Sequence, residues 1–211
     1  MLEIAGKKIP DTLEEIIDPG RTALLLWDME YAIAPNAFNF EEIVANLKPI
    51  TDLARKIGVP VFYSQQIAFD LEKQEAEAWV RVRMKRASGS TQEAKIPAGK
   101  KGHDIIDELA PKPGDAVFQK RRPDGFAGTD FDIMLRNKGI KTVIVGGVAT
   151  EGGVEGTART GRNLGYYMVI LKDCVGSRNR ELHDMALNLM EKTQFDVATA
   201  NQVAEIWRRK M

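Results

Sequence analysis

The sequence predicts a doubly wound α/β fold, with a mainly parallel sheet covered by helices on both faces. Two observations support this fold class. Short apolar runs alternate with longer amphipathic stretches along most of the 211 residues, which is the pattern of repeated strand–helix crossovers. The short runs are continuously apolar, as expected for parallel strands that are buried on both faces. A chain of this length fits one domain, residues 1–211, with a single core.

Six short segments are predicted to be strands because each is apolar and is bounded by polar or turn residues. The first, Thr22–Trp27, ends directly before Asp28, and the third ends directly before Lys120. In chain order the segments are 22–27, 59–64, 116–119, 141–145, 166–171 and 195–198.

Five longer segments are predicted to be helices. In the first, residues 41–57, apolar side chains recur at helical spacing, and Gly58 follows the last of them. Gly139 and Gly165 similarly follow the second and third helices, and glycine is the residue that most often ends a helix. The predicted helices are 41–57, 129–138, 151–164, 179–192 and 200–209.

The stretch 65–102 does not fit this alternation. It is rich in charge, contains Gly89 and Pro97, and has no simple strand pattern. A helical piece is expected around 71–85. Loops this long in a compact domain are usually functional or disordered. We interpret the stretch as a lid or an oligomer arm, which closes over this chain's pocket or over a neighbour's.

Composition excludes several classes of function. The formal net charge is zero, so there is no electrostatic case for binding nucleic acid or an anionic membrane surface. We find no apolar run long enough to span a bilayer and no signal-peptide core near the N-terminus. One cysteine and two histidines argue against internal disulfides and zinc sites. We therefore expect a cytoplasmic protein with no metal and no cofactor.

Three positions are predicted to meet at the carboxyl edge of the sheet, where ligands bind in such folds. Asp28 and Lys120 directly follow strands, and Gly153 lies in the turn after 141–145. Asp28 is either a residue that orders a loop or a general acid or base. Lys120 is either part of a solvated basic turn or an ammonium that supports Asp28.

The run G-V-A-T-E-G-G-V-E-G-T-A-R at 147–159 resembles the nucleophile turn of the isochorismatase-like cysteine hydrolases. The resemblance extends from Thr22 to about Trp207. It implies a six-stranded, Rossmann-like three-layer domain that acts on a small molecule and assembles as a homodimer or homotetramer. Asp28 and Lys120 match the family's catalytic pair, whereas Gly153 occupies the position of the catalytic cysteine, so that position is vacant.

The same resemblance implies where a substrate would bind. It assigns substrate contacts to Phe126 and to the turn, and a cis peptide to Val148–Ala149. It also assigns a substrate contact to the position of Gln66, which is otherwise an ordinary polar loop residue. The amides at the following helix start form an oxyanion hole in the cysteine enzymes, and backbone donors do not depend on the missing side chain. The expected substrate-binding residues are Gln66, Phe126, Val148, Ala149, Thr150 and Gly152.

Other residues depart from the family or stand apart from it. Glu30 replaces the glutamine of the common D-x-Q pattern, and no D-x-H metal pair is present. Cys174 is interpreted as an inert turn residue just past a strand, and His103 and His183 as surface or capping residues. The basic run 81–86 is either a solvated face or a clamp for a carboxylate substrate.

Three functions remain open. The first is a hydrolase that acts on a small anionic molecule through Asp28, Lys120 and water. The second is a catalytically degenerate module that binds a small molecule or a protein. The third is a Cys-loss variant of a small-amide amidohydrolase. The turn G-V-A-T-E is typical of amidase members, whereas glycine at the nucleophile position occurs among the isochorismatases, which use an acid and water to cleave a vinyl ether.

Overall fold

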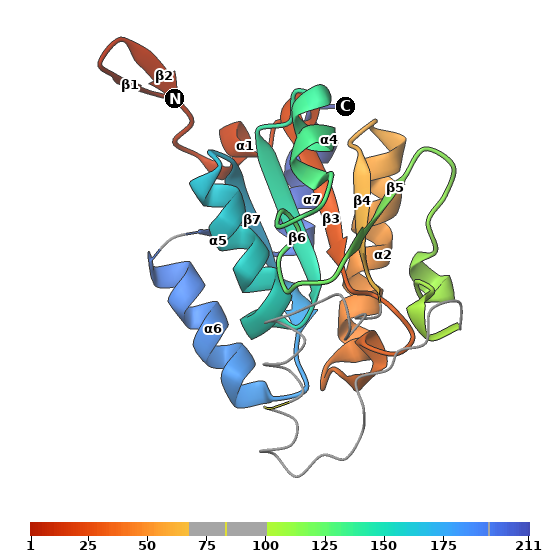
Figure 1. The fold of residues 1–211 in the computed structure, drawn as a ribbon. Helices are drawn as coiled ribbons and strands as arrows, with labels where there is room; N and C mark the ends of the chain where they lie inside the picture. Colours follow the sequence, from red (N-terminus) through yellow and green to blue (C-terminus); the bar gives the residue numbers. More distant parts are fainter. Residues whose placement is uncertain (68–82, 84–100, 194) are drawn as a thin grey trace.

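The structure is a computed structural model that describes residues 1–67, 83, 101–193 and 195–211. Its centre is a sheet of six parallel strands in the order β5-β4-β3-β6-β7-β8 (Figure 1). The predicted fold class is confirmed, and each predicted strand is present. The strands are β3 (Thr22–Trp27), β4 (Val61–Gln66), β5 (Ala116–Lys120), β6 (Thr142–Val148), β7 (Tyr167–Gly176) and β8 (Asp196–Ala198).

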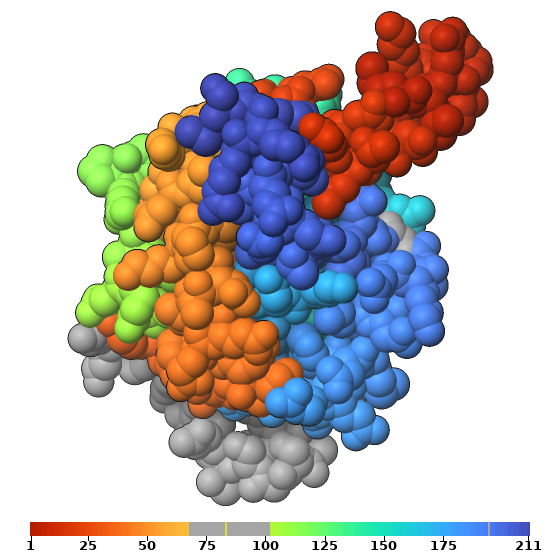
Figure 2. Space-filling view, turned by 180° about the vertical axis from the view of Figure 1, so that it is seen from behind, coloured from red at the N-terminus to blue at the C-terminus, as the bar shows by residue number. Residues whose placement is uncertain are grey.

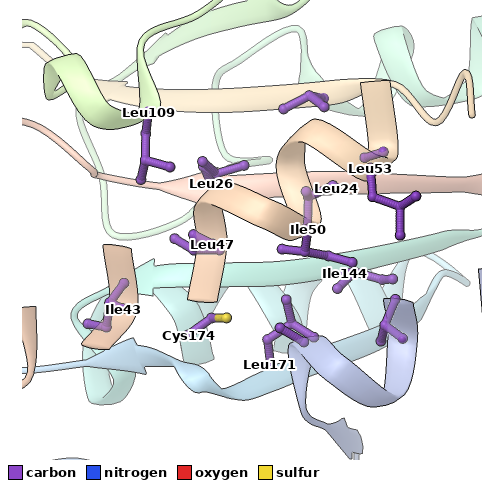
Figure 3. Packing of buried hydrophobic residues seen from close by; sticks show 14 of the residues in the cluster. Leu24, Leu26, Ile43, Leu47, Ile50, Leu53, Leu109, Ile144, Leu171 and Cys174 are labelled. Atoms are coloured by element: carbon purple, nitrogen blue, oxygen red, sulfur yellow. The ribbon is translucent and has the colours of Figure 1, made fainter. Parts of the chain in front are cut away.

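Helices cover both faces of this sheet. On one face, α2 (Phe40–Lys56) and α7 (Ala200–Arg209) lie side by side (Figure 2), and α2 packs on Leu24 and Leu26 of β3 (Figure 3). Leu25 and Trp27 point to the opposite face, into a second apolar cluster. That cluster includes residues of α4 (Phe131–Asn137), α5 (Glu155–Asn163) and α6 (Arg180–Thr193).

The N-terminal region was not predicted. Strands β1 (Leu2–Ile4) and β2 (Lys7–Ile9) form an antiparallel hairpin that projects from the body of the domain (Figures 1 and 2). The short helix α1 (Leu13–Ile16) follows, with a capping box between Thr12 and Glu15. The hairpin has mostly exposed side chains, so it lacks the buried apolar pattern by which strands are found in a sequence.

Two boundaries differ from the prediction for physical reasons. The helix expected from residue 151 is preceded by a π-helical turn, Thr150–Val154, and becomes α-helical at Glu155. Strand β7 continues to Gly176 because its pairing with β6 resumes after a register shift between Val145 and Gly147. Cys174 therefore lies inside a strand, which corrects its interpretation as a turn residue. Apart from Arg83, the expected helix at 71–85 falls outside the described residues, as does most of the predicted lid.

Gly147 brings β6 and β3 together at the carboxyl edge of the sheet. Its φ is +128°, and a Cβ atom there would lie 2.0 Å from the carbonyl oxygen of Trp27. Both the backbone conformation and the space therefore require glycine.

We expect Gly147→Ala to lower the free energy of unfolding by about 3 kcal/mol or more, because it adds overlap with the Trp27 backbone to an unfavourable φ. Gly58→Ala is the matched control, since Gly58 also has a positive φ but its Cβ would meet nothing within 4 Å. It should cost about 1 kcal/mol. Equilibrium urea unfolding measures both values, and an equal loss in the two variants would contradict this account.

Candidate active site

Asp28 and Lys120 form an ion pair at the carboxyl edge of the sheet. Lys120 Nζ lies 2.8 Å from Asp28 Oδ2, and the two residues are 2% and 7% exposed. Lys120 ends β5 and Asp28 follows β3, so the lysine side chain reaches across the end of the intervening strand β4. The structure thus brings together two of the predicted catalytic residues in a buried position.

Strand β4 supplies the polar groups that hold this pair. Ser64 Oγ donates to Asp28 Oδ1 at 2.8 Å and accepts from the Asp28 backbone N–H at 3.0 Å. Gln66 Oε1 accepts a hydrogen bond from Lys120 Nζ at 2.9 Å. Gln66 was a predicted substrate-binding residue, and its side chain directly contacts Lys120, a predicted catalytic residue. Ser64 was not predicted as a site residue. It pairs with Trp27 in the register of β3 and β4, and this places it beside Asp28.

Asp28 has an unusual backbone conformation. Its φ is +49°, in the left-handed region that residues other than glycine seldom adopt. Such conformations cluster at functional sites because the surrounding structure must hold them in place. Here the two hydrogen bonds with Ser64 contribute to that restraint.

Glu30 is a second carboxyl group in the site and is fully buried. Its Oε1 accepts the backbone N–H of Gln66, and its Oε2 lies 3.4 Å from His103 Nδ1. Burial and the nearby negative charge of Asp28 raise the pKa of Glu30 to about 8, against the opposing effects of the Gln66 hydrogen bond and Lys120. Glu30 therefore keeps its proton at neutral pH.

Both histidines differ from the prediction that they lie at the surface or cap helices. His103 and His183 are each 6% exposed. His183 Nδ1 lies 2.7 Å from Thr150 Oγ1, which also donates to the carbonyl of Gly176 at 3.0 Å. Burial lowers the pKa of His183, so the ring is neutral and fixes the turn after β6. The position of His183 in the sequence does not indicate its contact with Thr150, because this contact depends on how α6 packs.

Trp27 occupies the space next to the vacant nucleophile position. A Cβ atom on Gly153 would lie 2.0 Å from Trp27 Nε1 and 2.2 Å from Trp27 Cε2. The same indole has Lys120 Nζ at 4.4 Å from its ring centroid, which is a cation–π contact. With Trp27 in this conformation, neither cysteine nor any other side chain larger than hydrogen fits at position 153. Sequence reasoning missed Trp27, although a large aromatic residue beside Asp28 was a visible signal.

The turn after β6 has one backbone feature that the family resemblance implies. The Val148–Ala149 peptide is cis, as expected. The carbonyl of Ala149 accepts the N–H groups of Gly152 and Val154, both at 3.2 Å, so these two amides already have partners. Substrate binding by Val148, Ala149, Thr150 and Gly152 stays a prediction.

Phe126 and Cys174 are both buried away from solvent. The ring of Phe126 packs against Phe131 and Tyr166, with centroids 5.0 and 5.8 Å apart, and its contact with a substrate stays a prediction. Cys174 belongs to the cluster beneath α2 (Figure 3), on the face of the sheet opposite Trp27. Burial, helped by Asp173, raises the pKa of its thiol, which fits an inert residue.

The described residues include no group of three His, Cys, Asp or Glu side chains placed to hold a metal ion. None of their helices has the length and apolar character that crossing a membrane requires. A hollow of about 210 Å³ lies between Arg136, Lys141 and Tyr166. It is near the amino ends of β6 and β7, at the edge opposite the Asp28–Lys120 pair, and so is separate from this site.

Comparison with known proteins shows the family of the chain. Residues 22–202 match the isochorismatase domain. The chain is 30% identical over 209 residues to the ureidoacrylate amidohydrolase RutB of Pseudomonas syringae pv. syringae, an alignment that covers 90% of this chain and 85% of that protein.

Solved structures of similar fold include proteins described as isochorismatase-like and cysteine hydrolases. An isochorismatase-like hydrolase from Alkaliphilus metalliredigens has a TM-score of 0.72 and 26% identity, with 89% of this chain and 99% of that chain covered. A cysteine hydrolase from Pseudomonas syringae pv. phaseolicola has a TM-score of 0.82 at 21% identity, with 93% and 96% covered, a likeness of fold.

The raised pKa of Glu30 predicts how stability depends on pH. Between about pH 4.5 and pH 8 the unfolded chain has lost the Glu30 proton while the folded chain keeps it, so stability falls as pH rises through this window and levels off above it. Compared with Glu30→Gln, which cannot ionise, the wild type should lose a few kcal/mol more between pH 5 and pH 8.5. Urea unfolding at several pH values measures this, and parallel curves would contradict it.

The overlap between Trp27 and position 153 predicts strong coupling between the two residues. Gly153→Cys should destabilise the fold by about 1–3 kcal/mol, whereas the control Gly152→Cys should not, because its Cβ would meet only Ala149 Cβ, at 4.0 Å. In the double variant Trp27→Val/Gly153→Cys the freed space should recover about 1 kcal/mol or more relative to the sum of the single changes. Additive losses in urea unfolding would refute the steric explanation.

Proposed function

Because the chain belongs to the isochorismatase family of hydrolases, we propose that it hydrolyses a small anionic molecule with Asp28, Lys120 and water, without a covalent nucleophile. The observation that carries this proposal is the intact Asp28–Lys120 ion pair, at 2.8 Å, beside a position 153 from which Trp27 excludes a thiol. The proposed acid–base groups are therefore in place, while the family's usual nucleophile has no space.

The hydrogen bonds of Asp28 favour a role as general base. Lys120 and Ser64 each donate to one of its oxygens, and a carboxylate that accepts on both oxygens fits the ionised form. An ionised Asp28 takes a proton from water while the water oxygen bonds to the substrate carbonyl carbon. The bond between the carbonyl carbon and the leaving group then breaks, and the proton passes from Asp28 to the leaving group. Lys120 stabilises the negative charge that develops between these steps.

An amide or ureido substrate suits this sequence of steps. Such a substrate offers a carbonyl carbon to water, and a relative with 30% identity is named as a ureidoacrylate amidohydrolase. Vinyl-ether cleavage, as in isochorismatases, is the alternative reaction, and it would require Asp28 to begin protonated. The anionic character of the substrate rests on the basic run 81–86, of which only the exposed Arg83 is described.

The other two hypotheses are less well supported. A module that only binds a ligand has no need of a buried Asp28–Lys120 pair, which costs desolvation energy. A recent Cys-loss variant of an amidase would keep a space for the lost side chain. In this chain Trp27 fills that space, so two residues would have to change to restore a thiol.

The test is hydrolysis of ureidoacrylate, followed by chromatography, together with pyruvate release from isochorismate, both with the purified protein. We expect Asp28→Asn to lower kcat/KM at least about 100-fold, because the amide keeps the shape of the carboxylate but cannot act as a base. The control Asp196→Asn removes a carboxyl group at the far edge of the sheet, in β8, and should retain activity. Turnover that survives Asp28→Asn, or absence of turnover with both substrates, would count against the proposal.

A further inference from the structure

Glu30 is a buried carboxyl group that the proposed reaction does not use. It is fully buried, it lies two residues after Asp28, and it stands where the related pattern has an uncharged glutamine. Within the described residues its Oε2 accepts no hydrogen bond. A buried carboxylate oxygen without a donor is costly when charged, so this position requires an explanation.

Gln66 connects Glu30 to the catalytic pair. Its backbone N–H donates to Glu30 Oε1, and its side-chain Oε1 accepts from Lys120 Nζ at 2.9 Å. Lys120 Nζ donates in turn to Asp28 Oδ2 at 2.8 Å. One residue of β4 therefore contacts Glu30 through its backbone and Lys120 through its side chain, so a change at Glu30 has a short path to the lysine.

The charges around Glu30 explain why it is neutral. Among the residues that the structure describes, the titratable groups that face it are Asp28 from the end of β3, Lys120 from β5, and His103 from the segment before Ile105. The backbone of Ile105 bridges to Glu30. Asp28 and Lys120 balance one another. An ionised Glu30 would add an uncompensated negative charge to a buried site with a single ammonium among these groups, and burial and Asp28 hold its pKa near 8.

We propose that Glu30 is a positioning residue that sets, through Gln66, how Lys120 is shared between the two carboxyl groups of the site. While Glu30 is protonated, Lys120 is held on Asp28 in the geometry that the reaction needs. When Glu30 ionises, it attracts the ammonium and weakens the contact with Asp28. The effect on catalysis rests on the proposed function, whereas the effect on the Asp28–Lys120 pair does not.

The first test is the pH dependence of kcat/KM, on whichever of the two assay substrates is hydrolysed. The wild type should lose activity above about pH 8, and the ratio of Glu30→Gln to wild-type kcat/KM should rise about tenfold between pH 7 and pH 9, because glutamine cannot ionise. Asp196→Asn is the matched control: it removes another carboxyl group whose pKa burial raises, and it should decline as the wild type does. An unchanged alkaline decline in Glu30→Gln would overturn the proposal.

A second measurement does not need activity. The ¹³C signals of the Asp28 and Glu30 carboxyl carbons can be assigned with Asp28→Asn and Glu30→Gln and followed from pH 6 to pH 10. We expect the Asp28 signal to step at the pH at which Glu30 ionises, and this step to be absent in Glu30→Gln. An Asp28 signal that shows no step when Glu30 ionises would overturn the proposal. If Glu30→Gln folds poorly, Asp28→Asn alone assigns the Asp28 signal, and the wild-type spectrum still shows whether this signal has a step near pH 8.

The two measurements separate the two proposals. Absence of turnover with both substrates would remove the proposed function, while the carboxyl titration would still decide on Glu30. If turnover depends on Asp28 but the loss of kcat/KM at alkaline pH is the same in Glu30→Gln as in the wild type, the proposed function stands and the proposed role of Glu30 is refuted.

Discussion

The buried ammonium of Lys120 is the constraint on which the rest of the site depends. At 2% exposed it is shielded from water, and removing one partner of such a buried pair typically costs about 3–5 kcal/mol. The fold meets this demand with three neighbours from adjacent strands: Asp28 after β3, Gln66 at the end of β4, and the indole face of Trp27. The parallel order β5-β4-β3 places all of them at one edge.

Trp27 relates this ammonium to the missing nucleophile. The indole gives Lys120 an aromatic face and, through Nε1 and Cε2, fills the space that a side chain on Gly153 would need. Glycine at 153 is therefore a requirement of the packing around Trp27 and not simply the loss of a catalytic group. The π-helical turn that carries Gly153 begins at Thr150, whose hydroxyl contacts His183 of α6.

The sequence predicted the elements whose pattern is local and missed contacts that depend on packing. Asp28 and Lys120 were predicted to lie together because each follows an apolar strand, and parallel strands bring their carboxyl ends to one edge; the two side chains are in contact. His183 was interpreted as a surface or capping residue because nothing near it in the sequence shows that α6 packs it against Thr150. Cys174 was interpreted as a turn residue because the apolar run of its strand ends before it. Strand β7 in fact resumes its pairing after a register shift, and the apolar pattern does not show this. Glu30 was recognised as a departure, but its burial was not foreseeable from its spacing.

The chain departs from the family pattern at Gly153 and at Glu30, and both departures affect the charge around Lys120. In a cysteine hydrolase of this family, the lysine and aspartate act with a thiol, which is negative when ionised. In this chain an uncharged indole takes the space beside Lys120, and a second carboxyl group, Glu30, lies within the electrostatic reach of the same lysine. With Glu30 protonated, Asp28 is the one carboxylate among these groups that balances Lys120. In the proposed reaction this single ion pair acts on water, and an ionised Asp28 is the charge state that a general base requires.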